Sequence, residues 1–274
     1  GVLGGKPIHR VIATHHHLDH IGLAGWFMSE HGAGLTTTRT AYLMARMLQL
    51  DVQEAPTPEM CAFWRSCGMA SEVYDKRLNE RPFNTADAVT PIPLGYTRLR
   101  EGDEIEIGGR IWDVRCGNGH APEHATFWSR DGDLVIGGDQ LLGAISPNLG
   151  ASATEPLADP VGEWITSCES FVPHARDSHL VMTGHKLPYT GLPARLRQLL
   201  DNHHHALARL IEALKDPHTA CECFDVLFRR KIKEGEYGLA MVEAMAHCRH
   251  LEAQGLAIGH LREDGAILWQ AKAE

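Results

Sequence analysis

The stretch Thr14–His20 reads THHHLDH and directly follows the apolar run Val11–Ala13. Three histidines, an aspartate and a fourth histidine are an unusual density of imidazole and carboxylate for the end of a strand. A purification tag would lie at a terminus, and a solvated polar loop is the ordinary outcome for adjacent polar residues. A second run, His203–His205, has no carboxylate beside it, and we interpret it as an exposed helix face. The role of THHHLDH depends on whether other parts of the chain supply further His or Asp side chains beside it.

The same arrangement recurs at three further places. A short apolar run rich in β-branched residues, the pattern of a buried strand, ends in a loop that carries His or Asp. If these strands share one sheet, their loops meet at one edge, where open α/β architectures place their sites. The four junctions are HRVIA before THHHLDH, GGRIWDVRC before GNGHAPEH, DLVIGGD with Asp139, and SHLVM before TGH with His185.

The spacing within THHHLDH separates two pairs of side chains. Along an extended backbone successive side chains alternate, so His15 and His17 point to one side and His16 to the other. Asp19 and His20 then begin a helix, where an aspartate suits the N-terminal position. We therefore expect His15 to act with His17 and Asp19 with His20.

The other junctions complete two sets of metal ligands. The first pair with His120 makes a three-nitrogen set with an open position for water, the usual form of a catalytic zinc site. The second pair with His185 makes a set of mixed oxygen and nitrogen character. Asp139 could bridge the two metal ions, which together would lower the pKa of a shared water enough to make hydroxide at neutral pH.

Four motifs in this order, THHHLDH, GHAPEH, IGGDQ and TGHKLP, resemble those of the metallo-β-lactamase superfamily of hydrolases. The resemblance covers roughly residues 8–190 and matches the signature HxHxDH in full. The bridging aspartate and the last histidine make the chain similar to the binuclear glyoxalase II-like branch. The resemblance implies two divalent metal ions, zinc above all, with manganese or iron as alternatives. The ligands would be His15, His17, Asp19, His20, His120, Asp139 and His185.

The resemblance also implies a fold and further roles. The fold class is α+β, an αββα sandwich at residues 1–190 with a helical insertion or cap at 36–93. The family's first strands precede HxHxDH by some tens of residues, whereas this chain has fourteen residues before His15. Either an N-terminal segment is omitted, which we favour, or something else covers that side. Asp19 would orient the attacking hydroxide, and His124 would lie behind the metal ligands.

Residues 191–274 have a different pattern. Long helical patterns precede two alternating runs about Glu263–Gly265, which is the signal of a β-hairpin. Three helices and a hairpin resemble the winged-helix C-terminus of some β-lactamase-like proteins. We therefore divide the chain into a catalytic domain, 1–190, and a winged-helix-like domain, 191–274.

Five residues are candidates for contact with the substrate. Trp64 lies in a segment rich in aromatic and methionine side chains that could line an apolar wall for an acyl or aromatic group. Ser146 and Asn148 follow Asp139 in a Ser- and Pro-rich loop. Lys186 stands where the family often has a small residue, and Tyr189 follows in the same loop. For the helical segment and the loop after Asp139, a purely structural role stays open.

Composition limits the partners. The net charge of −9 disfavours non-specific attraction to nucleic acid, and from Pro193 onward 11 Lys and Arg face 12 Asp and Glu. The basic cluster Arg229–Lys233 is the local exception. No apolar run reaches the length of about 20 residues that a membrane helix needs. Seven scattered cysteines without a CxxC pair indicate reduced thiols, so we expect a cytoplasmic protein without a membrane partner.

Several functions stay open. The favoured one is a binuclear hydrolase of a small acyl substrate, such as a thioester or lactone. The alternatives are an RNA-processing metallo-nuclease, an iron-dependent persulfide dioxygenase, and a non-enzymatic protein whose tail serves dimerisation or regulation. The presence of all seven candidate metal ligands argues against a non-enzymatic protein. A homodimer is compatible with each of the other functions.

Overall fold

The computed structural model describes residues 4–273, which form two compact units. One unit contains the described residues of Gly1–Val52 with Phe83–Pro147 and Val172–Arg195. The other contains Gln53–Pro82, Asn148–Phe171 and the described residues of Leu196–Glu274. The units interleave along the chain, whereas the predicted domains, 1–190 and 191–274, are consecutive. That division stays a prediction.

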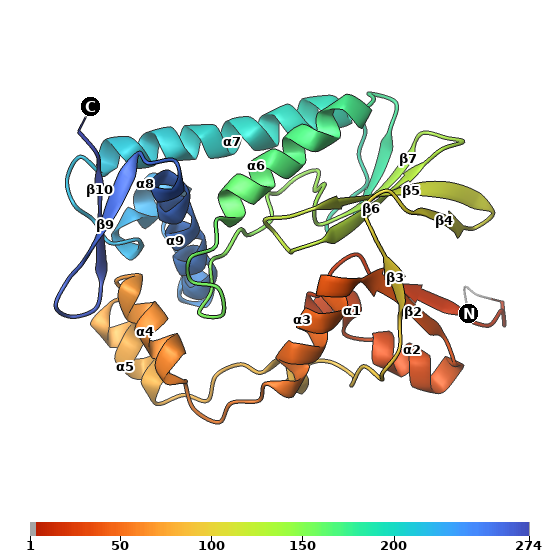
Figure 1. Ribbon diagram of the computed structural model, residues 1–274, viewed down its shortest axis with the longest axis horizontal. Coiled ribbons are helices and arrows are strands. Elements are labelled where there is room, and N and C mark those ends of the chain that lie inside the picture. Colours follow the sequence, from red (N-terminus) through yellow and green to blue (C-terminus); the bar gives the residue numbers. More distant parts are fainter. Residues whose placement is uncertain (1–3, 274) are drawn as a thin grey trace. The chain divides into compact units, whose positions relative to one another are not determined.

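A parallel three-stranded sheet forms one layer of the first unit, in the order β1-β2-β3. Its strands are β1 (Arg10–Ile12), β2 (Gly34–Thr38) and β3 (Thr97–Leu99). Three helices lie beside it (Figure 1): α1 (Leu18–Ile21), α2 (Ala24–His31) and α3 (Arg39–Leu50). A short 3-10 helix, η1 (Thr85–Asp87), follows later in the chain. Ala13, Leu35 and Ile21 form a buried cluster that joins this sheet to the helices.

A five-stranded sheet forms the second layer, in the order β4-β5-β6-β7-β8. Pairing is antiparallel from β4 to β7, and β7 pairs with β8 in parallel. The elements are β4 (Glu104–Ile107), β5 (Arg110–Gly117), β6 (His124–Ser129), β7 (Leu134–Gly138), β8 (Leu180–Thr183) and the 3-10 helix η2 (Val172–His174). Trp112, Val114 and Phe127 of this sheet share a core cluster with Ile12 and Leu99 of the other, so the two sheets face each other.

The four predicted strands exist, but they do not share one sheet, and that expectation is wrong. β1 belongs to the three-stranded sheet, whereas β5, β7 and β8 belong to the five-stranded one. The loops still meet because the sheets pack face to face through the common core. Thr36–Thr38, predicted to begin a helix, instead ends β2. These β-branched side chains are buried between strands, and the Thr37 hydroxyl donates to the carbonyl of Ala13 at 2.9 Å.

The second unit is mainly helical. Its hairpin, predicted about Glu263–Gly265, is confirmed, with β9 paired antiparallel to β10. Thr57 is the N-cap of α4, and its hydroxyl accepts the amide of Met60 at 3.3 Å. The first four residues of α7 belong to the first unit. The elements are α4 (Pro58–Ser66), α5 (Ser71–Leu78), α6 (Pro160–Phe171), α7 (Leu192–Ala213), η3 (Cys221–Cys223), α8 (Phe224–Phe228), η4 (Glu234–Glu236), α9 (Tyr237–Ala253), β9 (Ala257–Leu261) and β10 (Ile267–Ala271).

The expectation that His203–His205 form an exposed helix face is wrong for its first residue. His203 is buried, and its ring stacks on that of His247 with centroids 5.5 Å apart. It lies on the same helical stripe as the buried Leu199 and Leu207, one turn away on either side. Burial and the neighbouring His247 lower the pKa of His203 to about 3, so this imidazole is neutral in the folded protein.

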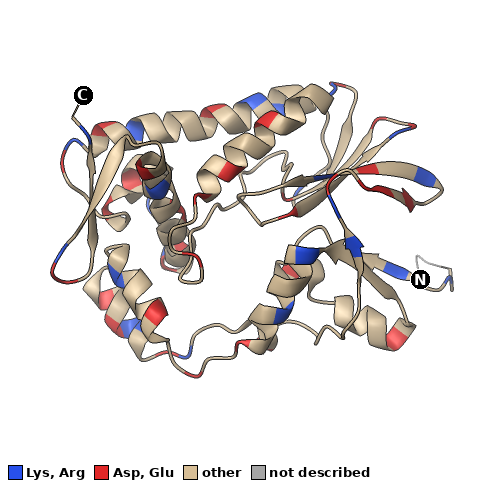
Figure 2. Cartoon of the chain, in the orientation of Figure 1, with Lys and Arg blue, Asp and Glu red and all other residues tan. Residues whose placement is uncertain are grey.

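Basic and acidic residues are both spread over the described chain (Figure 2). In the basic cluster Arg229–Lys233, Arg230 pairs with Glu236 at 2.6 Å. Lys76 pairs with Glu234 at 2.5 Å. Acidic partners thus balance part of the positive charge of the second unit. Within residues 4–273, no helix combines the length and the hydropathy needed to cross a membrane.

Candidate metal centre

All seven predicted ligands come together in the first unit. Their donor atoms form three overlapping groups, each compact enough to hold a metal ion. The turn from β1 into α1 carries four of the residues, and the remaining three follow β5, β7 and β8. Two of the groups correspond to the two predicted sets, and the third combines His15, His20 and Asp139.

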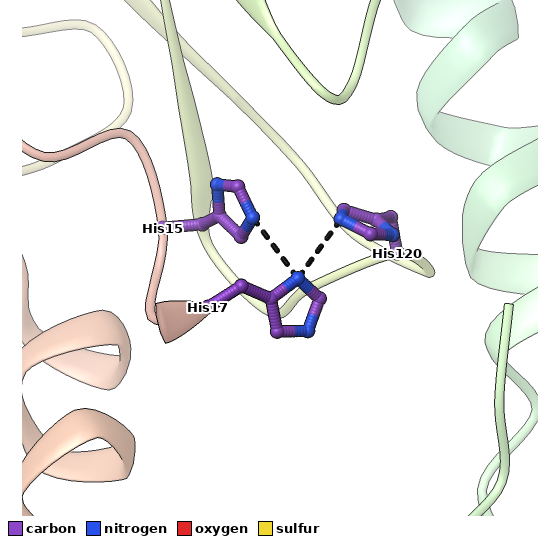
Figure 3. A group of neighbouring side chains, drawn as sticks. All are labelled: His15, His17 and His120. Carbon is purple, nitrogen blue, oxygen red and sulfur yellow. Dashed lines mark hydrogen bonds between the residues drawn. The ribbon is translucent and has the colours of Figure 1, made fainter. Parts of the chain in front are cut away.

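The first set consists of three imidazoles. Nε2 of His15 lies 3.0 Å from Nδ1 of His17, which lies 3.0 Å from Nε2 of His120 (Figure 3). His15 and His17 therefore point to one side of the chain, as alternation predicts. With zinc–nitrogen bonds of about 2.0–2.1 Å, neighbouring nitrogens of a tetrahedral site stand about 3.3 Å apart. The observed spacing is close to that requirement.

The second set is more exposed and mixes ligand types. Oδ2 of Asp19 lies 3.2 Å from Nε2 of His185 and 3.6 Å from Nε2 of His20. The side chains of Asp19 and His185 are 49% and 42% exposed, whereas that of His120 is 8% exposed. The centre therefore has a closed side at the first set and an open side at Asp19 and His185.

Asp139 joins the two sets. Oδ1 of its carboxylate lies 3.4 Å from His20, and Oδ2 lies 3.5 Å from His120 and 3.2 Å from His185. Asp139 is buried, yet neither its Oδ1 nor the buried Nε2 of His20 has a hydrogen-bond partner among the described residues. A buried polar atom without a partner is costly. A cation between the sets would satisfy both atoms, so the residues present fit a pair of metal ions.

The protonation states of His15, His17 and Asp139 also suit coordination. Burial, together with neighbouring histidines, lowers the pKa of His15 far below its usual range and that of His17 to about 2. Burial opposes ionisation of Asp139, but the neighbouring His120 and His20 outweigh it and hold the pKa of that carboxyl well below its usual range. Neutral imidazoles and an ionised carboxylate are the forms that bind metal.

His124 lies behind Asp139, and the role expected for it stays a prediction. The backbone amide of Asp139 donates to Nε2 of His124 at 3.1 Å. Gly138 has φ +49°, and a Cβ there would stand 2.6 Å from Cε1 of His124. A Cβ on Gly184 would stand only 2.2 Å from Oδ1 of Asp139. The two glycines thus allow the close approach of the Asp139 strand end to His124 and to the β8 loop.

These two glycines shape the candidate centre, and the sequence analysis did not single them out. The signal was present, since each glycine directly precedes a candidate ligand at the end of a strand, in IGGD and in TGH. A glycine at such a place indicates close approach of the backbone to another group.

The candidate substrate contacts of the first unit lie at or near its surface. Ser146 and Lys186 are exposed, and Lys186 has φ +69°. Tyr189 is half-buried, and its hydroxyl donates to the carbonyl of Leu141 at 3.4 Å. Their contact with substrate stays a prediction.

The other two candidates belong to the second unit. The amide of Asn148 donates to the carboxylate of Glu243 at 2.7 Å. Trp64 is buried, with its ring in an edge contact with Tyr74 at a centroid distance of 6.4 Å. Their roles in substrate binding also stay predictions, as does a cap formed by residues 36–93.

Comparison with known proteins gives one consistent result. The family model described as the metallo-beta-lactamase superfamily matches residues 2–213, and the model described as the metallo-beta-lactamase-like C-terminal domain matches residues 207–272. The chain is 27% identical over 264 residues to the "Probable metallo-hydrolase YqjP" of Bacillus subtilis (strain 168), covering 91% of this chain and 76% of the relative.

Two solved structures are similar over nearly the whole chain. A beta-lactamase domain protein from Burkholderia ambifaria is 30% identical with a TM-score of 0.86, covering 98% of this chain and 76% of that one. The metallo-beta-lactamase family protein TTHA1429 from Thermus thermophilus is 26% identical with a TM-score of 0.76, covering 96% of this chain and 80% of that one.

Proposed function

The chain belongs to the metallo-β-lactamase superfamily and is a metal-dependent hydrolase; from this premise we propose that it holds two divalent metal ions, zinc above all, and hydrolyses a small acyl substrate such as a thioester or lactone. The observation that carries the proposal is Asp139, whose two carboxylate oxygens face both ligand sets. A site for one metal ion would not need this arrangement.

We assign separate roles to the residues of the centre. When bound, the metal ions would lower the pKa of a water and polarise the carbonyl of the substrate. His15, His17 and His120 would hold one ion on the closed side, and Asp19, His20 and His185 would hold the other. Asp19 would also orient the attacking water by accepting a hydrogen bond from it. The substrate arrives at the open side, where Asp19 and His185 are half exposed.

The C-terminal part supports a narrower proposal. From α7 to α9 the chain is helical, and β9 and β10 then close an antiparallel hairpin. This order supports a winged-helix-like domain at residues 191–274, and a homodimer is compatible with it. Glu236, the acidic partner of Arg230, weakens the alternative that this part binds nucleic acid.

A substrate panel tests the chemistry. Protein loaded with zinc, manganese or iron would be offered acyl thioesters, lactones, single-stranded RNA and a low-molecular-weight persulfide, with oxygen consumption followed for the last. We expect turnover of a thioester or lactone without oxygen uptake. A variant His120→Ala should lose it, because one nitrogen of the closed-side set is removed.

The matched control is His204→Ala, which removes an exposed histidine in the second unit and should turn over like the wild type. RNA cleavage alone, or oxygen uptake with persulfide alone, would contradict the proposed reaction and select one of the alternative functions.

A further inference from the structure

Glu123 occupies an unusual backbone position beside the metal centre. It lies between His120 and His124 and has φ +49°, in the left-handed region that disfavours a residue with a Cβ. Such a conformation persists where surrounding contacts stabilise it, and it is often found at functional sites. The contacts of Glu123 show what stabilises it here.

The carboxylate of Glu123 reaches a different part of the chain. Its Oε2 accepts the backbone amide of Thr40 at 2.8 Å and the Thr40 hydroxyl at 2.5 Å. Thr40 lies in the first turn of α3, where amides lack intrahelical partners and a negative charge is favourable. Thr38 bonds the amide of Ala41 in the same turn. The other oxygen, Oε1, lies 3.9 Å from Arg98 of β3.

The backbone of Glu123 closes the loop that carries His120. Its amide donates to Oδ1 of Asn118 at 2.9 Å, so the loop between β5 and β6 folds back on its own start. Two residues later, the amide of Ala125 donates to the carbonyl of Thr14 at 2.8 Å, next to His15. Position 123 is therefore tied to its own loop through the backbone and to α3 through the side chain.

We propose that Glu123 is a positioning residue of the metal centre: its carboxylate anchors the β5–β6 loop to the first turn of α3 and thereby fixes the place of His120 in the closed-side ligand set. This inference rests on the proposed role of His15, His17 and His120 as metal ligands. A glycine at 123 would adopt the backbone conformation more easily, but it would leave the loop without its anchor.

Three variants separate anchoring from a general contribution to folding. Glu123→Gly removes the anchor and relieves the backbone, Glu123→Ala removes the anchor and keeps the Cβ, and Glu123→Gln keeps an oxygen that Thr40 can bond. The matched control is Glu106→Ala, an exposed glutamate of β4 in the same unit. Zinc affinity by chelator competition and the Tm of metal-free protein would be measured for each.

We expect the Gly and Ala variants to bind the tighter zinc about 10- to 100-fold more weakly, the usual effect of losing a residue that orients a ligand. The zinc affinity of the Gln variant should fall only a few-fold, and that of the control should not change. Glu123→Gly should melt no lower than Glu123→Ala. In metal-free protein, both should shift the NMR signals of the His120 ring and speed hydrogen exchange of the Thr40 amide.

Unchanged zinc affinity and unchanged His120 signals in the Gly and Ala variants would overturn the inference. The inference would also be overturned if zinc affinity fell equally in Glu123→Ala and Glu123→Gln and in proportion to the fall in Tm. Wild-type protein that binds no zinc would instead contradict the proposed function, and the His120 and Thr40 signals of metal-free protein would still decide whether Glu123 anchors the loop.

Discussion

Replacing Asp139 by alanine should lower kcat/KM by about 1,000-fold, which corresponds to about 4 kcal/mol of lost transition-state stabilisation. Its carboxylate lies close to His20, His120 and His185, so its two oxygens face both ligand sets. Removing one preorganised charged group from a buried site has effects of this size. Steady-state kinetics on the preferred acyl substrate would measure the change.

The same variant should lose the two metal ions unequally. The closed-side set keeps three imidazoles, whereas the set of Asp19, His20 and His185 is partly open to water and would lose its ion first. Elemental analysis after dialysis should give about one equivalent, the number that one complete set can hold.

The matched control for Asp139→Ala is Asp133→Ala, at the other end of β7. It removes an exposed carboxylate that pairs with Arg176 at 2.9 Å, and exposed pairs contribute about 0–1 kcal/mol. Its activity and metal content should equal those of the wild type. Two tightly held ions in Asp139→Ala would show that this residue does not join the sets.

Replacing Gly184 by alanine should lower kcat/KM by about 100-fold although it replaces none of the seven candidate ligands. The new Cβ would stand 2.2 Å from Oδ1 of Asp139 and 2.7 Å from Cε1 of His20. One of these groups must move by about 1 Å, a displacement that can cost about 100-fold in rate. Metal affinity should fall with the rate. Because position 184 is exposed, the Tm should change little.

Gly34→Ala is the matched control for this variant. It lies in β2 of the same unit, and its Cβ would meet only the carbonyl oxygen of His9, at 3.9 Å. It should keep wild-type activity and metal content. If Gly184→Ala kept them as well, the position of the Asp139 carboxylate would not limit the reaction.

Much of the centre was predictable from local sequence because ligands at strand ends have short-range signals. The alternation of His15 and His17 follows from an extended backbone, and their ring nitrogens do converge with that of His120. The α+β metallo-β-lactamase fold expected from four motifs is confirmed by the family model and the similar structures.

Properties that depend on long-range packing were not predictable. The assignment of β1 to a separate sheet depends on its pairing with β2, which follows two helices later, and on the pairing of β2 with the distant β3. The β-strand at Thr36–Thr38 depends on burial between neighbouring strands. No short-range pattern marks the bond between Glu123 and Thr40, which are 83 residues apart.

His203 illustrates the same limit within a helix. Its place on a helical stripe with Leu199 and Leu207 is visible in the sequence, but three consecutive histidines suggested a polar face. Burial against His247 of another helix decides the environment of this ring. Tertiary context therefore overrode the local polarity of the run.

Anomalous diffraction at the zinc absorption edge, from crystals of the zinc-loaded protein, tests the central claim most directly. We expect two peaks per chain, one among His15, His17 and His120 and one among Asp19, His20 and His185. The Asp139 carboxylate should contact both. A single peak, or a second peak away from Asp139, would contradict the claim that these seven residues form one two-metal centre.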